Sequence, residues 1–279
     1  MKLFNRSEPS VKRTAILSVT ALCLAAISAL TRTLCLFFFY DEIGYFKTGA
    51  VLPVIFNVIY TLSILFFAFC SICFSPITPK ANPGKPEKLS SLIVCAAFVP
   101  LIITKAVSTF GASGTDKPSL IAILSVVFAL LSAAYFASLA FCKQPSAISV
   151  MLGVACIIWA VISWISSYLD FFVPMNSPDK LFFHFACIGA ILVVFADIRA
   201  IYGIPRPKMY FFSFCAGLVA LCTSSLPSII ANAKNLFASY SLLYEDIAFL
   251  AIAIYAAVRL LTHTGDEKSK SDSDGTDAE

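Results

Sequence analysis

Six polar residues that fall inside apolar stretches are the candidates for chemistry in this sequence. They are Glu245, Asp246, Lys105, Asn57, His184 and Arg32. Ionisable and strongly polar groups are costly in hydrocarbon, so each of them marks a candidate functional site. The neighbouring carboxylates of Glu245 and Asp246 have the chemistry to bind a proton or a cation, because a carboxyl group in a low-dielectric site can hold its proton near neutral pH.

Glu245 and Asp246 cannot both face one partner, because adjacent residues on a helix point about 100° apart. One carboxylate is predicted to meet Lys105 or Arg32 from a neighbouring helix, which would offset part of the cost of desolvating it. The other carboxylate is left to contact water.

The elements that must position these residues are eight apolar stretches, each long enough to cross a bilayer. A hydrocarbon core about 30 Å thick needs roughly 20 helical residues per crossing. The predicted fold is therefore all-α: a polytopic membrane protein with a bundle of about eight transmembrane helices. The approximate spans are residues 14–36, 50–73, 90–109, 119–142, 147–169, 181–202, 209–230 and 238–262.

These spans form one transmembrane domain, residues 14–262. Residues 1–13 are predicted to be a cytoplasmic N-terminus, and residues 263–279, rich in Ser, Asp and Lys, a disordered acidic cytoplasmic tail. The proline-rich segment 74–89 is predicted to be a turn-rich connector.

The composition excludes a soluble domain and a nucleic-acid-binding one. Hydrophobic residues make up 59% of the chain and charged residues 13%, with a mean hydropathy of +0.88, against about 45–50% and about 25% in soluble domains. The net charge of +4 gathers in no basic cluster beyond a short N-terminal one, so no nucleic-acid partner is predicted. The predicted partner is the lipid bilayer, together with a small solute or a partner membrane protein.

The ten cysteines are predicted to be free thiols, because almost all lie in apolar stretches, where cysteine behaves as a small buried hydrophobe. Cys70 and Cys73 have the C-x-x-C spacing of redox and metal motifs, but no second pair accompanies them. The two histidines are too few for a histidine-based site. We therefore predict no metal, no cofactor and no catalytic residues, and an enzyme would need a constellation that the sequence does not show.

The distribution of Lys and Arg predicts that both termini lie in the cytoplasm, because most of the 20 basic residues then fall on the cytoplasmic side. Arg259, near the end of the last span, is expected to snorkel to that side. Counting back about 20 residues of 1.5 Å rise places Glu245 and Asp246 roughly 9 Å below the outer surface.

All six candidates then lie toward the outside. An outward-facing, water-filled polar vestibule would produce this pattern, and so would ordinary anchoring at the membrane interface. Pro53, Pro100 and Pro227 fall inside spans, where proline frees a backbone carbonyl and permits a kink. Broken helices line transporter sites, but proline is also common in membrane helices generally.

The segment from Tyr40 to Gly49 combines two acids, two glycines and three aromatic residues between the first two spans. This aromatic–acid–Gly–aromatic–x–x–Gly junction resembles that of uncharacterised multi-span membrane proteins of Clostridia-type Firmicutes. The resemblance covers these ten residues and the order of the apolar stretches. It implies a multi-pass protein of a bacterial cytoplasmic membrane and brings no known activity.

Two functions remain open from the sequence. The first is a small-solute transporter, similar to a permease, with an outward-facing polar vestibule. The alternative is a non-catalytic membrane sensor or a subunit of a membrane complex. A transporter needs a water-accessible polar path, whereas a subunit needs a partner protein.

Overall fold

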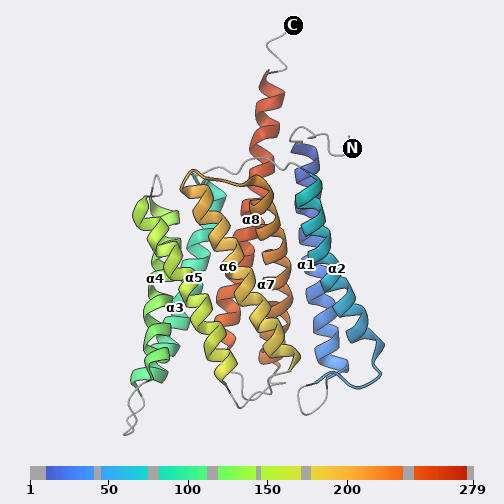
Figure 1. Ribbon diagram of the computed structural model, residues 1–279. Helices are drawn as coiled ribbons and strands as arrows, with labels where there is room; N and C mark the ends of the chain where they lie inside the picture. Colours follow the sequence, from blue (N-terminus) through green and yellow to red (C-terminus); the bar gives the residue numbers. More distant parts are fainter. Residues whose placement is uncertain are drawn as a thin grey trace.

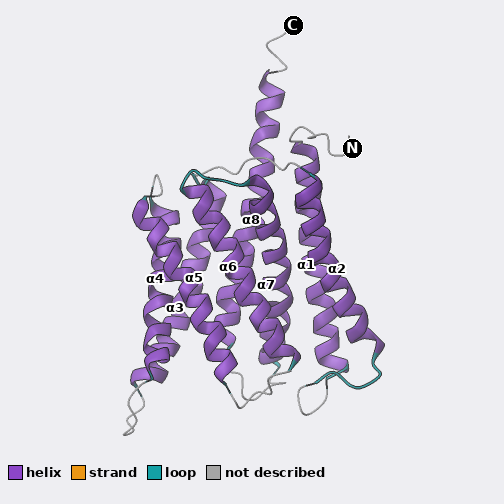
Figure 2. Cartoon of the chain, in the orientation of Figure 1, coloured by secondary structure: helices purple, strands orange, loops and turns teal. Residues whose placement is uncertain are grey.

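The computed structural model describes residues 11–40, 45–74, 82–111, 119–142, 146–170, 177–234 and 242–274, with side chains from residue 13 to residue 262 within these ranges. Their regular structure is helical, apart from one β-bridge between Tyr40 and Phe46 (Figure 2). The helices are α1 (Val11–Phe38), α2 (Val51–Cys73), α3 (Lys85–Phe110), α4 (Leu120–Phe141), α5 (Ala147–Leu169), α6 (Pro178–Ile201), α7 (Pro207–Ala233) and α8 (Leu243–Asp274).

These helices coincide with the eight apolar stretches, and the differences lie at their ends. Helix α3 begins at Lys85 rather than at residue 90, so the last part of the predicted connector 74–89 is its first turn. Pro86 is well placed there, because the N–H it lacks would have no partner in a first turn. The Glu87 side chain accepts a hydrogen bond from the backbone N–H of Gly84 and so caps the helix.

Helix α8 is longer than the last predicted span. Its helical backbone continues to Asp274, whereas a disordered tail is predicted above from residue 263. Adding residues to an existing helix costs much less than nucleating a new one, which favours helix beyond Thr262. Residues 275–279 lie outside the described residues.

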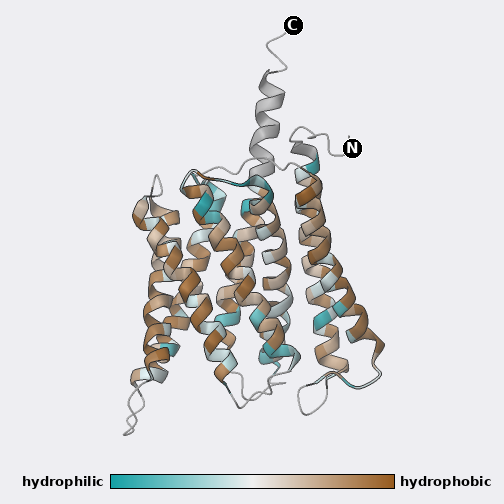
Figure 3. Cartoon of the chain, in the orientation of Figure 1, coloured by the Kyte–Doolittle hydropathy of each residue, from teal (hydrophilic) through white to brown (hydrophobic). Residues whose placement is uncertain are grey.

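Helices α1 to α7 are each long and apolar enough to cross a membrane, so the chain is an integral membrane protein of the helical class. Apolar positions cover most of the length of the helices, and polar ones gather toward the two ends of the bundle (Figure 3). Helix α8 differs because Glu245, Asp246 and Arg259 interrupt its apolar sequence.

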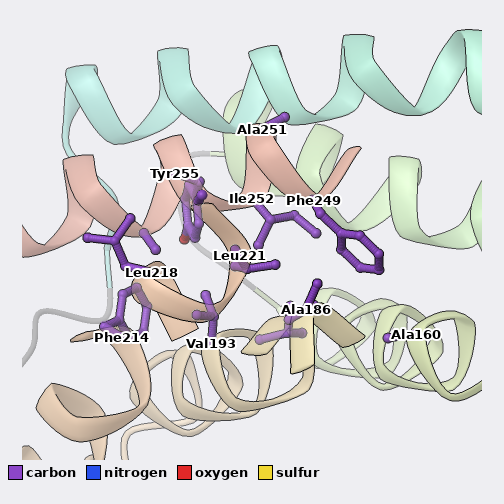
Figure 4. Packing of buried hydrophobic residues seen from close by; sticks show 14 of the residues in the cluster. Ala160, Ala186, Val193, Phe214, Leu218, Leu221, Phe249, Ala251, Ile252 and Tyr255 are labelled. Atoms are coloured by element: carbon purple, nitrogen blue, oxygen red, sulfur yellow. The ribbon is translucent and has the colours of Figure 1, made fainter. Parts of the chain in front are cut away.

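The position of α8 explains how it can carry these charges. It packs against α7, α3, α1 and α6, and among its described side chains only Ile254 and Leu261 are exposed. Phe249, Ile252 and Tyr255 extend from it toward α7 and α6 (Figure 4). The charged side chains of α8 are therefore shielded by the neighbouring helices.

The start of α1 and the end of α8 lie at the same end of the bundle (Figure 1). We call this the terminal end, and the opposite end, where α1 finishes at Phe38 and α8 begins at Leu243, the distal end. Helix α2 is peripheral, since its backbone packs against α1 and α7 alone among the described helices.

Helices α6 and α7 approach closely at two glycines. A Cβ atom on Gly217 would lie 2.5 Å from Cγ2 of Val193 and 2.9 Å from the carbonyl oxygen of Gly189. Small residues allow such close contact between backbones in membrane proteins, where packing drives helix association.

We expect Gly217→Ala to lower the free energy of unfolding by about 1–3 kcal/mol, because the added methyl group overpacks this contact. Titration of the detergent-solubilised protein with SDS measures the change. Gly84→Ala is the control, since its Cβ would meet its nearest neighbours at 3.8 Å. Equal losses in the two variants would contradict a tight α6–α7 contact.

Candidate functional site

Arg32, near the distal end of α1, is fully buried and joins three helices. Its Nη2 donates a hydrogen bond to Oδ1 of Asp179 on α6 at 2.7 Å. Its Nη1 donates to the backbone carbonyls of Thr223 at 2.7 Å and Ser224 at 2.8 Å, both on α7. The hydroxyl of Tyr40 donates to the other carboxylate oxygen of Asp179 at 2.7 Å. The charge of Arg32 is thus balanced inside the protein.

The sequence of α7 makes this contact possible. Pro227 lies four residues after Thr223 and has no N–H, so the Thr223 carbonyl loses its usual helical donor. Arg32 supplies a donor instead. Helix α7 therefore continues to Ala233 across its proline, with its freed carbonyl bonded to a side chain from α1.

Glu245, in the first turn of α8, is paired with Lys105 of α3. Its Oε1 lies 2.6 Å from Nζ of Lys105, and its side chain is 2% exposed against 26% for the lysine. The second oxygen, Oε2, is buried and has no hydrogen-bond partner. Of the two partners that the sequence offers for this carboxylate, the fold places Lys105 beside it.

Asp246 is also 2% exposed, so the structure buries the carboxylate that the sequence leaves to water. Its side chain forms no hydrogen bond or ion pair within the described part of the chain. The charges that act on it are those of Arg32, Glu245 and Asp179. Glu245, one residue earlier, faces α3, so Asp246 points about 100° away from that contact.

We expect Lys105→Met to lower the free energy of unfolding by about 1–3 kcal/mol, because it leaves Glu245 buried without its partner. Glu245→Gln should cost less, since the lysine can turn toward the interface. Thermal denaturation in detergent compares the two, with Lys85→Met at the exposed start of α3 as control. A smaller effect for Lys105→Met than for Glu245→Gln would contradict the pairing.

The structure places His184 and Asn57 apart from these ion pairs. His184 is half-buried on α6 beside the ring of Trp164, and its buried Nε2 has no hydrogen-bond partner. Asn57 is exposed on the face of α2 that points away from the bundle. Of the six candidates, Arg32, Lys105, Glu245 and Asp246 are thus the ones in or beside the buried ion pairs at the distal end.

Asp179 is not among the six candidates from the sequence, because the predicted span begins only at residue 181, whereas α6 begins at Pro178. Ser177 and Pro178 carry the signal that would have found it. The Ser177 hydroxyl accepts a hydrogen bond from the backbone N–H of Lys180 at 3.3 Å, and proline follows in the first turn. This cap-and-proline pattern starts the helix early enough to include Asp179.

A second buried cluster lies at the terminal end, around Asp197 of α6. This carboxylate is fully buried and accepts hydrogen bonds from the hydroxyls of Tyr135 at 2.8 Å and Tyr255 at 2.7 Å. Arg259 of α8 donates to it from Nη2 at 2.7 Å and from Nε at 3.2 Å. Helices α4, α6 and α8 therefore meet at one carboxylate.

Arg259 also pairs with Glu87, which extends the cluster to α3. Its Nη1 lies 3.1 Å from Oε2 of Glu87, whose Oε1 accepts a hydrogen bond from the Thr262 hydroxyl at 2.7 Å. Arg259 is 2% exposed, so it does not snorkel to the interface as expected. Two carboxylates inside the bundle offer it better partners than the interface does.

The two clusters differ in how completely they are paired. At the distal end, Asp179 and Glu245 are ion-paired with Arg32 and Lys105, whereas the side chain of Asp246 forms no ion pair with the described residues. At the terminal end, both carboxylates are hydrogen-bonded or ion-paired. Proton exchange is the chemistry that the unpartnered carboxylate offers.

All ten cysteines are free thiols, Cys70 and Cys73 included. Within the described ranges, no three His, Cys, Asp or Glu side chains come together as a metal site would require.

Comparison with known proteins adds no assignment to this geometry. No protein-family model matches the chain, and no curated protein or solved structure matches it.

Proposed function

We propose that this protein is a small-solute transporter, similar to a permease, in a bacterial cytoplasmic membrane with both termini in the cytoplasm. In this proposal all eight helices cross the membrane, and the distal end faces outward. Asp246 is the group that takes up and releases a coupling proton. The observation that carries the proposal is a carboxyl group 2% exposed, without a hydrogen bond in the described residues, beside the Arg32 ion pair.

Burying a carboxylate without a hydrogen bond is expensive, and the cost falls when the group takes up a proton. Asp246 is therefore suited to change its protonation state when water reaches it. Structural carboxylates in this bundle, such as Asp197, are instead held by several donors.

Protonation of Asp246 would act on the contacts between helices through Arg32. An ionised Asp246 competes electrostatically with Asp179 for this guanidinium, and a protonated one leaves the Arg32–Asp179 pair undisturbed. Arg32 also bonds the freed carbonyl of α7. A proton at Asp246 thereby favours one arrangement of α1, α6 and α7, which is how a coupling ion biases a transporter between states.

A non-catalytic membrane sensor, or a subunit of a membrane complex, is the second candidate. The observation that favours it is the depth of burial: Arg32, Glu245 and Asp246 are each at most 2% exposed, so the predicted polar vestibule is closed in this structure. A permanently closed interior fits a protein that binds partners through its outer surface.

Electrical recording from proteoliposomes on a solid-supported membrane tests transport directly. Amino acids, sugars and small carboxylic acids are applied as pure solutes at controlled pH. We expect at least one class to give a transient current that Asp246→Asn abolishes. Asp170→Asn, which alters a half-buried carboxylate at the C-cap of α5, is the control and should keep the current. A current that persists in Asp246→Asn would overturn the role of this residue.

Chemical accessibility distinguishes the two candidates. Asp246→Cys and Phe249→Cys are placed in a chain whose natural cysteines are replaced, and intact cells are treated with a membrane-impermeant maleimide. A transporter that opens outward labels at 246 and not at the fully buried 249. Absence of labelling at both positions, together with absence of current for every solute, would reject transport in favour of the sensor or subunit.

A further inference from the structure

An apolar groove opens on the outer surface of the bundle between α2, α6 and α7. It has a volume of about 690 Å³ including its open mouth. Its walls include Tyr60 and Leu65 of α2, Phe185 and Leu192 of α6, and Phe212 and Ala220 of α7. The groove lies within segments long and apolar enough to cross a membrane, so the medium that meets it is the lipid bilayer.

The groove runs parallel to the helices. Tyr60, Phe185 and Ala220 form its distal end, and Leu65, Leu192 and Phe212 form the end toward the termini. At a rise of 1.5 Å per residue, the lining of α6 and α7 extends over about 10 Å. An apolar groove that runs along the helices suits an extended hydrocarbon chain, which lies along the helices in a bilayer.

Aromatic packing and small residues create the groove. Rings of Phe56 and Tyr60 on α2 contact Phe182 on α6, with centroids 5.1 Å and 5.3 Å apart, and hold α2 away from the α6 backbone. Gly189 and Ala216 keep the floor low where α6 and α7 meet. The aromatic contacts thus keep α2 apart from α6, and the small residues leave the space between them unfilled.

Asn57 provides the polar feature next to this groove. Its amide is exposed on α2, one turn before Thr61, and it makes no hydrogen bond with the described residues. Thr61 lines both the groove and the shallow pocket around Asn57. An amide that faces hydrocarbon without a partner is costly, so its position calls for a polar group from the surroundings.

We propose that this surface binds a glycerophospholipid, with one acyl chain in the groove and an ester carbonyl accepting a hydrogen bond from the Asn57 amide. A phospholipid combines a long apolar chain with a hydrogen-bond acceptor at its base, which matches the apolar groove and the neighbouring amide. The site is separate from the buried ion pairs and does not depend on the transport proposal.

Native mass spectrometry of the purified protein, titrated with palmitoyl-oleoyl phosphatidylglycerol, tests the site. Leu192→Trp fills the groove and is expected to weaken the tightest lipid binding about tenfold or more. Ile103→Trp is the matched control on the exposed face of α3 and should leave binding unchanged. Equal binding by the wild type and both variants would mean non-specific annular lipid only and would overturn the proposal.

A diether analogue of the same lipid, which has no ester carbonyls, tests the role of Asn57. Asn57→Leu is expected to weaken binding of the ester lipid about fivefold, the value of one hydrogen bond near 1 kcal/mol. The same substitution should leave binding of the diether lipid unchanged. If Asn57→Leu weakens binding of both lipids equally, the Asn57 amide does not donate a hydrogen bond to the ester carbonyl.

Discussion

Replacing Arg259 by methionine is expected to lower the free energy of unfolding by about 3–5 kcal/mol. The change leaves the carboxylates of Asp197 and Glu87 buried without their cationic partner. An uncompensated buried charge costs far more than the net value of the ion pair itself. Titration of detergent-solubilised protein with SDS measures the loss.

Arg199→Met is the matched control for this prediction. Arg199 lies on α6, two residues after Asp197, and is half-buried, with its guanidinium 5.9 Å from the ring centre of Phe195. Its replacement should change stability by no more than about 1 kcal/mol. The prediction fails if Arg259→Met and Arg199→Met are equally stable.

The double substitution Arg259→Met with Asp197→Asn refines the test. Arg259→Met alone leaves two buried carboxylates without a cationic partner, and Asp197→Asn removes one of them. The double variant should therefore be more stable than Arg259→Met alone. Residues that share one network show coupling energies of about 0.5–3 kcal/mol. Strict additivity of the two changes would mean that the Arg259–Asp197 contact contributes little.

The second large effect is expected at the distal end, where Arg32→Leu should cost about 3–5 kcal/mol. The substitution removes the cation from Asp179 and the donor from the Thr223 carbonyl at once. Arg32→Lys should recover part of this loss, because an ammonium restores the charge but lacks the fork of the guanidinium. The same SDS titration measures all three proteins.

Pro227→Ala offers a specific check of this arrangement. Alanine restores an N–H that can bond the Thr223 carbonyl, so Arg32→Leu should cost about 1 kcal/mol less in the Pro227→Ala background. Pro100→Ala in α3 is the matched control. It restores an N–H to a helix whose carbonyls accept no hydrogen bond from Arg32. Full additivity of Arg32→Leu with Pro227→Ala would show that Arg32 does not replace the missing helical donor.

The two ion pairs between α3 and α8 have opposite polarity. Lys105 on α3 meets Glu245 on α8 at the distal end, and Glu87 on α3 meets Arg259 on α8 at the terminal end. A shift of one helix along the other would separate both pairs. Together they fix the antiparallel register of the two helices and keep the charged residues of α8 within the bundle.

The eight helices could be predicted from the sequence because the reason for them is local. Backbone groups in hydrocarbon must bond within their own segment, so an apolar stretch of sufficient length becomes a helix wherever it packs. Capping rules are local too. Reading Ser177–Pro178 and Pro86–Glu87 as helix starts would have placed the beginnings of α6 and α3 correctly.

The sequence alone determined that this chain is a helical membrane protein and that Glu245, Asp246 and Arg32 needed an explanation inside it. Only the tertiary structure decided their partners: Lys105 for Glu245, Asp179 and the α7 carbonyls for Arg32, none among the described residues for Asp246. It also turned Arg259 inward and Asn57 outward. The physical reason is that helices apolar on nearly every side carry little information about which face meets which neighbour. Partners more than a hundred residues apart, such as Arg32 and Asp179, are therefore brought together by packing that no local pattern records.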